Sequence, residues 1–213
     1  MNREEIRALG VGVDVSHHNV DGRGAPLDWN AVLAAGFKFA IVKATDGVGF
    51  VDPAFADNVN GAVAAGITVG AYHFLRPGED AAAQADLFLA QVDAVGTENL
   101  ALGAAVDVED PDDDPGAWDR IPHATRILKV QHWLQPVEAV FPDRPLIYCI
   151  PHWWAQRFGL AGDFSGHPLW AASPGRTPDL SGTTWQEWTI WQFKFIGTVP
   201  GIGVKSVDLD RTQ

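Results

Sequence analysis

The sequence predicts an irregular, TIM-like α/β barrel built as a single domain. Eight segments have the apolar alternation or the short apolar runs that are typical of β-strands. Helix signals separate the first strands, and the spacing between the last strands contracts. With 213 residues and 46% hydrophobic side chains, the chain is long enough to bury a complete core. We expect one domain over residues 1–213, with the barrel at about residues 10–210.

The first three strands are separated by helices whose ends are recognisable. Asp28 is expected to cap a short helix that Gly36 closes. Asp52 is expected to cap a longer helix, with Pro53 in its first position and Gly66 at its end. The three strands are predicted at residues 11–16, 37–43 and 67–74.

The alternation continues to the sixth strand and then changes. A helix with Glu79 and Asp80 in its first turn is expected to end near Gly96. Two further helices are predicted, at residues 118–141 and 153–158. Because a helical crossover takes at least about 10 to 12 residues, we expect short loops and antiparallel pairing among the last three strands. Strands four to eight are predicted at residues 102–110, 145–150, 168–173, 188–193 and 205–210.

The fourth strand leads into two carboxylates. Residues two apart in a strand share a face, so Asp107 and Glu109 are expected to point the same way, roughly 6.6 Å apart along the backbone. Val106 and Val108 then take the opposite face and pack under a helix. Such a pair suits acid/base chemistry, although an exposed strand end or a metal-binding turn would have the same pattern.

Two more acids are expected at the same end of the barrel. Asp14 lies near the end of the first strand, and Asp208 lies in the last strand, which neighbours the first if the barrel closes. Crowded carboxyls raise the pKa of at least one member, which keeps a proton donor beside an ionised acid. Each of these two acids alone would also fit a loop cap or an ion pair.

Composition narrows the function classes. The net charge of -12 argues against binding to nucleic acids or anionic membranes. The single cysteine, Cys149, excludes an intrachain disulfide and is expected to be a small buried side chain. The N-terminal residues lack the apolar core of a signal peptide, and no apolar run of about 18 residues predicts a membrane span.

Aromatic side chains near strand ends favour a sugar ligand. The chain has nine Trp, two Tyr and eleven Phe residues, and aromatic rings stack on the apolar faces of pyranoses. Most tryptophans in proteins are partly buried packing residues, so each position also has that interpretation. The aromatic residues singled out at strand ends are Tyr72, Phe74, Tyr148, Trp170 and Trp191.

Several ordered motifs resemble glycoside hydrolase family 25, the Chalaropsis-type lysozymes. The resemblance runs from about residue 10 to residue 210 and implies a (β/α)5β3 barrel. It also implies hydrolysis of the β-1,4 bond between N-acetylmuramic acid and N-acetylglucosamine in peptidoglycan. The motifs are Gly12-Val-Asp-Val-Ser16, Tyr72-His-Phe74, Asp107-Val-Glu109, Leu169-Trp170, Trp191-Gln192, Val199-Pro-Gly-Ile-Gly203 and Val207-Asp-Leu209.

The resemblance also assigns roles. Glu109 matches the general acid, and Asp14, Asp107 and Asp208 match the acids around it. An aspartate nucleophile and assistance by the substrate's own acetamido group both remain open; we expect the second, with Asp107 orienting that group. No cofactor or metal is expected. The expected partner is the glycan strands of bacterial peptidoglycan. We expect the protein to be a monomer that acts at the cell wall or outside the cell. Substrate contacts are expected from Tyr72, Phe74, Lys43, Tyr148, Trp170, Trp191 and Gln192.

Some positions depart from the family pattern. Pro174 stands where a tyrosine is usual, and Asp46 stands where a glutamate is common. The acidic run at residues 110–114 lacks the spacing of an EF-hand, because its twelfth position is Ile121, so a solvated loop is favoured over a calcium site. The histidines at 17, 18 and 73 lack metal-ligand spacing and are expected to be structural.

Two other classes share part of this pattern. A chitinase-like hydrolase would carry the longer string D-x-x-D-x-D-x-E, which is absent, since residues 103–106 read Gly-Ala-Ala-Val. A glycan-binding module without activity would keep the aromatics and lose the acids. The four acids therefore favour an enzyme.

Overall fold

The computed structural model describes residues 1–20, 26–204 and 206–213, and these residues form a closed barrel of eight strands with one short additional strand. The ring runs β1, β2, β4, β5, β6, β7, β8 and β9, and β9 pairs with β1 to close it. The predicted irregular (β/α)5β3 barrel is confirmed. The strands are β1 Val11–Val15, β2 Phe39–Asp46, β4 Thr68–Phe74, β5 Gly103–Asp107, β6 Leu146–Cys149, β7 Leu169–Ala172, β8 Ile190–Gly197 and β9 Val207–Thr212.

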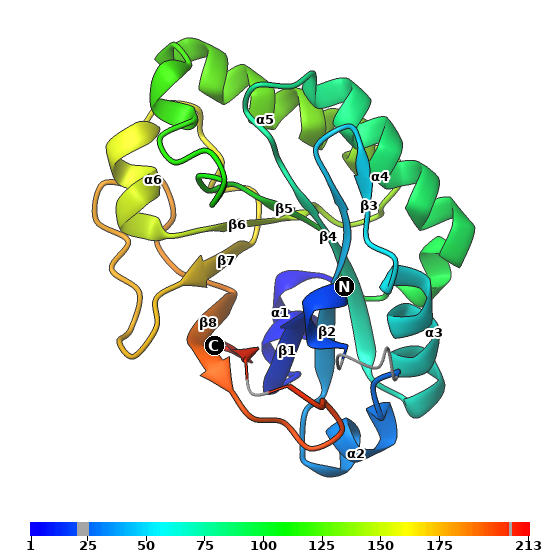
Figure 1. Ribbon diagram of the computed structural model, residues 1–213. Coiled ribbons are helices and arrows are strands. Elements are labelled where there is room, and N and C mark those ends of the chain that lie inside the picture. Colours follow the sequence, from blue (N-terminus) through cyan, green and yellow to red (C-terminus); the bar gives the residue numbers. More distant parts are fainter. Residues whose placement is uncertain (21–25, 205) are drawn as a thin grey trace.

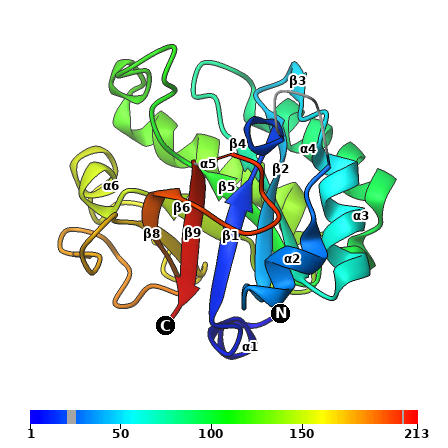
Figure 2. The ribbon, with the colours of Figure 1, turned by 60° about the horizontal axis from the view of Figure 1, so that its bottom comes forward.

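The strand directions correct one expectation. From β1 to β8 all neighbouring strands of the ring are parallel, and β9 runs antiparallel to both β8 and β1. Figure 2 shows β1 and β9 side by side with opposed arrows. Antiparallel pairing was therefore right for β8 with β9 and wrong for β7 with β8. Residues 173–189 contain no helix, yet they are long enough to return the chain to the start of the barrel.

In the described part of the chain, five α-helices surround the strands and leave the side beside β8 to irregular loops (Figure 1). The cap at Asp28 is confirmed, because its carboxylate accepts the backbone N–H group of Ala31. Glu79 and Asp80 were expected in the first turn of α4, but they precede it: Asp80 is the N-cap, and its carboxylate accepts the backbone N–H group of Ala83. Gly66 and Gly96 end their helices with positive φ angles of 86° and 83°. The helices are α2 Trp29–Ala34, α3 Phe55–Ala65, α4 Ala81–Val95, α5 His123–Glu138 and α6 Pro151–Arg157.

Two further predicted helix starts are also wrong. The N-cap of α3 is Ala54, and the buried carboxylate of Asp52 instead accepts the backbone N–H groups of His17 and Ala54. The helix predicted at residues 118–141 is divided into a short 3-10 turn, η3 (Trp118–Arg120), and α5. Pro122 explains the division, because it lacks an N–H group and holds the preceding residue in an extended conformation.

One α-helix and one short strand were not predicted. Helix α1 (Arg3–Arg7) is stabilised by a capping box between Asn2 and Glu5, and Figure 2 shows it beneath the start of β1. Its Ile6 is 1% exposed and packs into the inside of the barrel. The short strand β3 (Phe50–Val51) pairs with the end of β2.

The core has two layers. Outward-facing strand residues such as Val13 and Val106 pack with the surrounding helices. Inward-facing residues such as Ile41, Leu146 and Trp170 fill the barrel itself. Together these layers hold the strand ends rigidly, which is the condition for a fixed constellation of side chains at one mouth.

Two segments that the sequence analysis discussed contain residues that the structure does not describe. Residues 21–25 of the loop after the first strand and Lys205, the predicted start of the last strand, lie outside the described residues. Cys149 is buried and unbridged. In the described part of the chain, no helix is long and apolar enough to cross a membrane.

Candidate active site

A hollow of about 560 Å³ opens at the carboxyl ends of the parallel strands. We call it the acid hollow, because Asp14, Glu109 and Asp208 line it together with Asp112. Tyr72 and Tyr148 are also among its lining residues, and the rest are Val15, Ser16, His18, Asn19, Ile150, Phe195, Ile196 and Ser206. Three acids predicted from the opening, middle and closing segments of the chain thus share one cavity.

Strand register brings these acids together. Asp14 on β1 lies directly opposite Asp208 on β9, so their side chains share the inner face of the barrel. Asp107 is the last residue of β5, between Phe74 on β4 and Tyr148 on β6. The expected division of faces is present, since Val106 and Val108 are fully buried in the outer core.

Glu109 lies two residues beyond the end of β5 and is fixed through its backbone. The indole Nε1 of Trp118 donates to the carbonyl oxygen of Glu109 at 2.9 Å. The neighbouring Asp110 accepts the backbone N–H of Trp118 at 3.2 Å and the Nε1 of Trp153 at 3.0 Å. The side chain of Glu109 is therefore held at the mouth of the barrel by contacts that do not use its carboxyl group.

The pKa values of the central acid pair are raised. Burial, followed by the charge of Asp112, raises the pKa of Glu109 to about 7, while Lys43 lowers it. Burial and the charge of Glu109 raise the pKa of Asp107 well above its usual range. Asp107 Oδ1 is buried and has no hydrogen-bond partner in the described part of the chain. A carboxyl group that keeps its proton near neutral pH can donate it to a leaving oxygen.

The facing pair is shifted in the same direction. Burial and then the charge of Asp14 raise the pKa of Asp208 to about 8. Burial and then the charge of Asp210 raise the pKa of Asp14, and a hydrogen bond from Gln192 opposes this shift. The acid hollow therefore holds several carboxyl groups that cannot all be ionised at neutral pH.

Gln192 links the acids to an aromatic residue. The Tyr148 hydroxyl donates to Gln192 Oε1 at 2.8 Å, which orients the amide. Gln192 Nε2 then donates to Asp14 at 2.8 Å and to Asp208 at 3.4 Å. Gln192 is 2% exposed, so the structure places it behind the acids rather than on the open surface.

Lys43 lies in a neighbouring hollow of about 360 Å³, which we call the Lys43 pocket. Its ammonium group is 3.0 Å from Asp46, and Asp46 also accepts the guanidinium Nε of Arg76 at 2.6 Å. The same ammonium lies 5.2 Å from the ring centre of Phe74 and 6.0 Å from that of Tyr72. The pocket is lined by His17, His18, Lys43, Asp46, Gly49, Phe50, Arg76 and Glu79.

The remaining aromatic candidates lie away from the acid hollow. Trp170 is 2% exposed and packs inside the barrel against Tyr148. Trp191 is not among the lining residues; its Nε1 donates to the carbonyl of Ser173, and the guanidinium of Arg211 lies 4.0 Å from its ring centre. Phe74 faces the Lys43 pocket through Lys43 and Arg76.

The acidic run at residues 110–114 is engaged by arginines. Asp113 pairs with Arg76, Asp114 pairs with Arg120, and Asp110 pairs with Arg157. Within residues 1–20, 26–204 and 206–213, no group of three His, Cys, Asp or Glu side chains is arranged to hold a metal ion.

Two features of the site were not predicted from the sequence. Asp210 is fully buried beside Asp14, although it has the same strand parity as Asp208 and could have been found by the period-two rule. His17 Nδ1 lies 2.8 Å from the buried carboxylate of Asp52, a contact that sequence spacing does not indicate. The departure at Pro174 lies in a turn after β7, beyond the residues that line the acid hollow.

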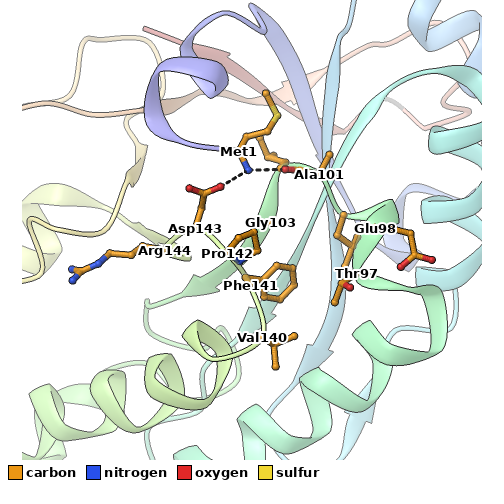
Figure 3. A pocket seen from close by; sticks show the side chains of 12 residues that line it. Met1, Thr97, Glu98, Ala101, Gly103, Val140, Phe141, Pro142, Asp143 and Arg144 are labelled. Atoms are coloured by element: carbon orange, nitrogen blue, oxygen red, sulfur yellow. Dashed lines mark hydrogen bonds and ion pairs between the residues drawn. The ribbon is translucent and has the colours of Figure 1, made fainter.

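A second hollow lies at the other end of the barrel, near the first residues of β5 and β6. It measures about 310 Å³, and Figure 3 shows the Met1 ammonium group between the carbonyl of Ala101 and the carboxylate of Asp143. None of the predicted site residues lines it. The chemistry suggested by the sequence is therefore confined to the mouth that holds the acids.

Comparison with known proteins gives consistent results. The family described as "Glycosyl hydrolases family 25" matches residues 13–202. The chain is 31% identical over 208 residues to Lysozyme M1 of Streptomyces globisporus, covering 95% of this chain and 66% of that protein. It is 30% identical over 191 residues to the N,O-diacetylmuramidase of a Chalaropsis species, covering 85% and 86% of the two chains.

Solved structures agree in fold. A bacterial lysozyme from Streptomyces coelicolor matches with a TM-score of 0.78 and 28% identity, over 96% of this chain and 92% of that chain. A family 25 glycosyl hydrolase from Bacillus anthracis matches with a TM-score of 0.80 and 26% identity, over 95% and 88%. The barrel and its length are thus shared with both.

Proposed function

Because the chain belongs to glycosyl hydrolases family 25 and is a glycoside hydrolase, we propose that it cleaves the β-1,4 bond between N-acetylmuramic acid and N-acetylglucosamine in peptidoglycan. The observation that carries the proposal is the acid hollow itself. Glu109, with a pKa of about 7, lies in one cavity with Asp14 and Asp208, directly after Asp107 at the end of β5. That combination supplies a proton donor next to ionisable partners.

Glu109 is the general acid and then the general base. Its carboxyl group protonates the glycosidic oxygen as the bond to the anomeric carbon breaks. The resulting carboxylate then takes a proton from the water that attacks the intermediate. The raised pKa supports the first step, because a substantial fraction of Glu109 still carries its proton near neutral pH.

Asp107 assists through the substrate. In our proposal it accepts a hydrogen bond from the N–H of the 2-acetamido group, whose carbonyl oxygen attacks the anomeric carbon. The partnerless Oδ1 of Asp107 supports this role, because a buried acceptor without a donor is costly unless a ligand supplies one. Whichever of Asp14 and Asp208 is ionised stabilises the positive charge that develops on the sugar, since their raised pKa values disfavour two charges near neutral pH.

Sugar contacts come from the walls of the acid hollow. Tyr72 and Tyr148 line it and offer ring faces and hydroxyl groups. Lys43 lies next to it and reaches both Tyr72 and Phe74. The polymeric substrate implies action at the cell wall, by a protein that we propose to be monomeric. Trp170, Trp191 and Gln192 would act behind these contacts rather than on the sugar.

The test uses Glu109→Gln and a matched control, Glu98→Gln, which changes an exposed glutamate at the opposite end of the barrel. We expect Glu109→Gln to slow the clearing of bacterial cell walls by at least about 100-fold, because removing a general acid typically costs 10²–10⁴. The control should clear walls at the wild-type rate. Equal clearing by Glu109→Gln would remove this residue from its role.

Product analysis tests the bond and the mechanism. Mass spectrometry of the released fragments should find new reducing ends on N-acetylmuramic acid. Ends on N-acetylglucosamine would instead point to a chitinase-like or glucosaminidase specificity. Retention of configuration in the first-formed product is expected from acetamido assistance, and inversion would exclude it.

A further inference from the structure

Asp210 is a buried acid next to the acid hollow that does not line it. It lies on β9, two residues after Asp208 and therefore on the same inner face of the barrel. Its side chain is 0% exposed. Trp170 Nε1 on β7 donates to Asp210 Oδ1 at 2.7 Å. The other oxygen, Oδ2, is buried and receives no hydrogen bond from the described residues.

The neighbour of Asp210 on β1 is Asp14. The residue directly opposite Asp210 is Gly12, which has no side chain, and the next inward residue of β1 is Asp14. Asp14 and Asp210 are therefore diagonal neighbours across the β1–β9 pair, near enough for their carboxyl groups to meet through the partnerless Oδ2 of Asp210. Two carboxyl groups form a hydrogen bond only when one of them carries a proton.

The groups around Asp14 and Asp210 favour a state in which one of the two carboxyl groups carries a proton. The acids Asp208 and Glu109 act on the pair by their charges, which disfavour a second ionisation. Among the described residues, the side-chain donors are Gln192 from β8 to Asp14 and Trp170 from β7 to Asp210, one for each carboxyl group. Burial raises the pKa of Asp210 to about 7 and that of Asp14 well above its usual range. Two adjacent buried carboxyl groups with this little compensation cannot both be ionised.

We propose that Asp210 is a positioning residue of the reaction, which shares one proton with Asp14 and thereby fixes the Asp14 carboxyl group against Gln192 at the wall of the acid hollow. The pair then presents one negative charge to the sugar instead of two. The shared hydrogen bond also sets the direction in which Asp14 faces the anomeric carbon. This inference rests on the proposed glycoside hydrolysis for its consequence, but the shared proton is a property of the free protein.

Two substitutions separate the hydrogen bond from the charge. Asp210→Asn keeps an oxygen for Trp170 and offers an N–H group to Asp14 permanently, in place of the shared proton. Asp210→Leu has a similar size, removes both functions and leaves Asp14 with Gln192 alone. Both variants should be compared with the wild type by circular dichroism, so that loss of fold is recognised.

The first measurement needs no substrate. Carboxyl 13C NMR titration of Asp14 in the wild type should show a strongly raised pKa, and in Asp210→Asn the same signal should titrate at least about one unit lower, because a like charge is lost and a donor is gained. An unchanged Asp14 titration in a folded Asp210→Asn variant would overturn the shared proton. This result stands whether or not Asp210→Leu folds.

The second measurement tests positioning. We expect Asp210→Asn to keep cell-wall clearing within about threefold of the wild type at pH 5 to 6, whereas Asp210→Leu should lose at least about tenfold, a loss expected when an acid near the reacting centre loses its anchoring hydrogen bond. An Asp210→Asn variant as impaired as Asp210→Leu would overturn the inference, since a permanent donor would not have replaced the proton. Failure of the proposed function would look different, because the NMR shift would remain while Glu109→Gln cleared walls normally.

Discussion

The proton on Glu109 is held by burial and by neighbouring acids, and Lys43 acts against both. Lys43 lowers the pKa of Glu109 and also that of Asp107. Its ammonium group is largely enclosed by Asp46 and the rings of Phe50, Tyr72 and Phe74. A partly buried charge is screened weakly by salt, so its effect on the acids persists at physiological ionic strength.

The opposing effects of burial and of Lys43 on the pKa of Glu109 predict how activity depends on pH. Activity should fall as pH rises through about 7, because Glu109 must carry its proton to act as an acid. Lys43→Met removes the cation that favours the ionised form, so the alkaline midpoint of kcat/KM should move upward by about 0.5 to 1 unit. Lys38→Met, at an exposed position just before β2, is the control and should leave the midpoint unchanged. A downward shift in Lys43→Met would contradict this account of Glu109.

At this scale the sequence predicts the acids better than the aromatics. Asp14, Asp107, Glu109 and Asp208 could be found because parity along a strand decides which face an acid takes, and the ends of parallel strands meet at one mouth. Parity cannot tell how deep a ring lies. Trp170 shares the inner face yet is covered, and Trp191 lies outside under Arg211, since both positions depend on neighbours far away in sequence.

Among the elements, β1 is constrained by close packing at Gly12. Gly12 lies opposite Asp210, and a Cβ atom on it would come within 2.5 Å of the Phe39 ring. The contact is between strands β1 and β2, whose pairing sets the position of Asp14. A ring locked in a filled barrel has little freedom to move away.

Gly12→Ala should therefore destabilise the protein by about 1 to 3 kcal/mol, the usual cost of overpacking a core. Urea unfolding followed by tryptophan fluorescence measures this change as a lower midpoint with an unchanged slope. Gly49→Ala is the matched control, because a Cβ atom there meets nothing within 4 Å. If both variants unfold at the same urea concentration, the Phe39 contact does not restrict this position.

Element types were easier to predict than element ends and directions. The order of strands and helices followed from apolar patterning, and the cap at Asp28 followed from side-chain chemistry. Asp52 has the same local chemistry but is used by His17, a contact across the fold that no local signal encodes. The parallel direction of β8 was not predicted, because the segment before it contains no helix and was therefore expected to be a short antiparallel connection. A crossover to a parallel strand needs sufficient length but not a helix.

For the whole molecule, the raised pKa values of the carboxyl groups in the acid hollow reduce the stability of the fold as the pH rises. An acid whose pKa is raised on folding binds its proton more tightly in the folded state than in the unfolded state. This tighter proton binding adds fully to the free energy of unfolding below the pKa of the unfolded state. The added stability is lost as the pH rises through the pKa of the folded state. For Glu109 this window runs from its usual pKa of 4.5 to about 7. His73, buried between Thr45 and Gln84 with a pKa lowered to about 4, acts in the opposite sense below pH 6.5.

Glu109→Gln should therefore stabilise the protein at pH 8, by up to about 3 kcal/mol, since one pKa unit corresponds to about 1.36 kcal/mol. The gain should vanish at pH 4, where the wild-type carboxyl group is neutral as well. Thermal unfolding at both pH values, with Glu98→Gln as the exposed control, measures the difference in Tm. A Tm gain of equal size at pH 4 would mean that packing, not ionisation, is responsible.

The antiparallel strand β9 brings the two ends of the barrel wall together. Thr212 donates its backbone N–H to the carbonyl of Gly10 at 2.8 Å, and Gly10 donates to Thr212 Oγ1 at 3.0 Å. Figure 2 shows both termini on the side of the molecule where α1 lies, whereas β1 ends and β9 begins on the other side. Asp14 lies near that end of β1, and Asp208 lies near that start of β9. A protein immobilised on a bead through either terminus would thus present its opening to the suspension, and a short peptide ligated between the two ends would give a circular enzyme with an unobstructed mouth.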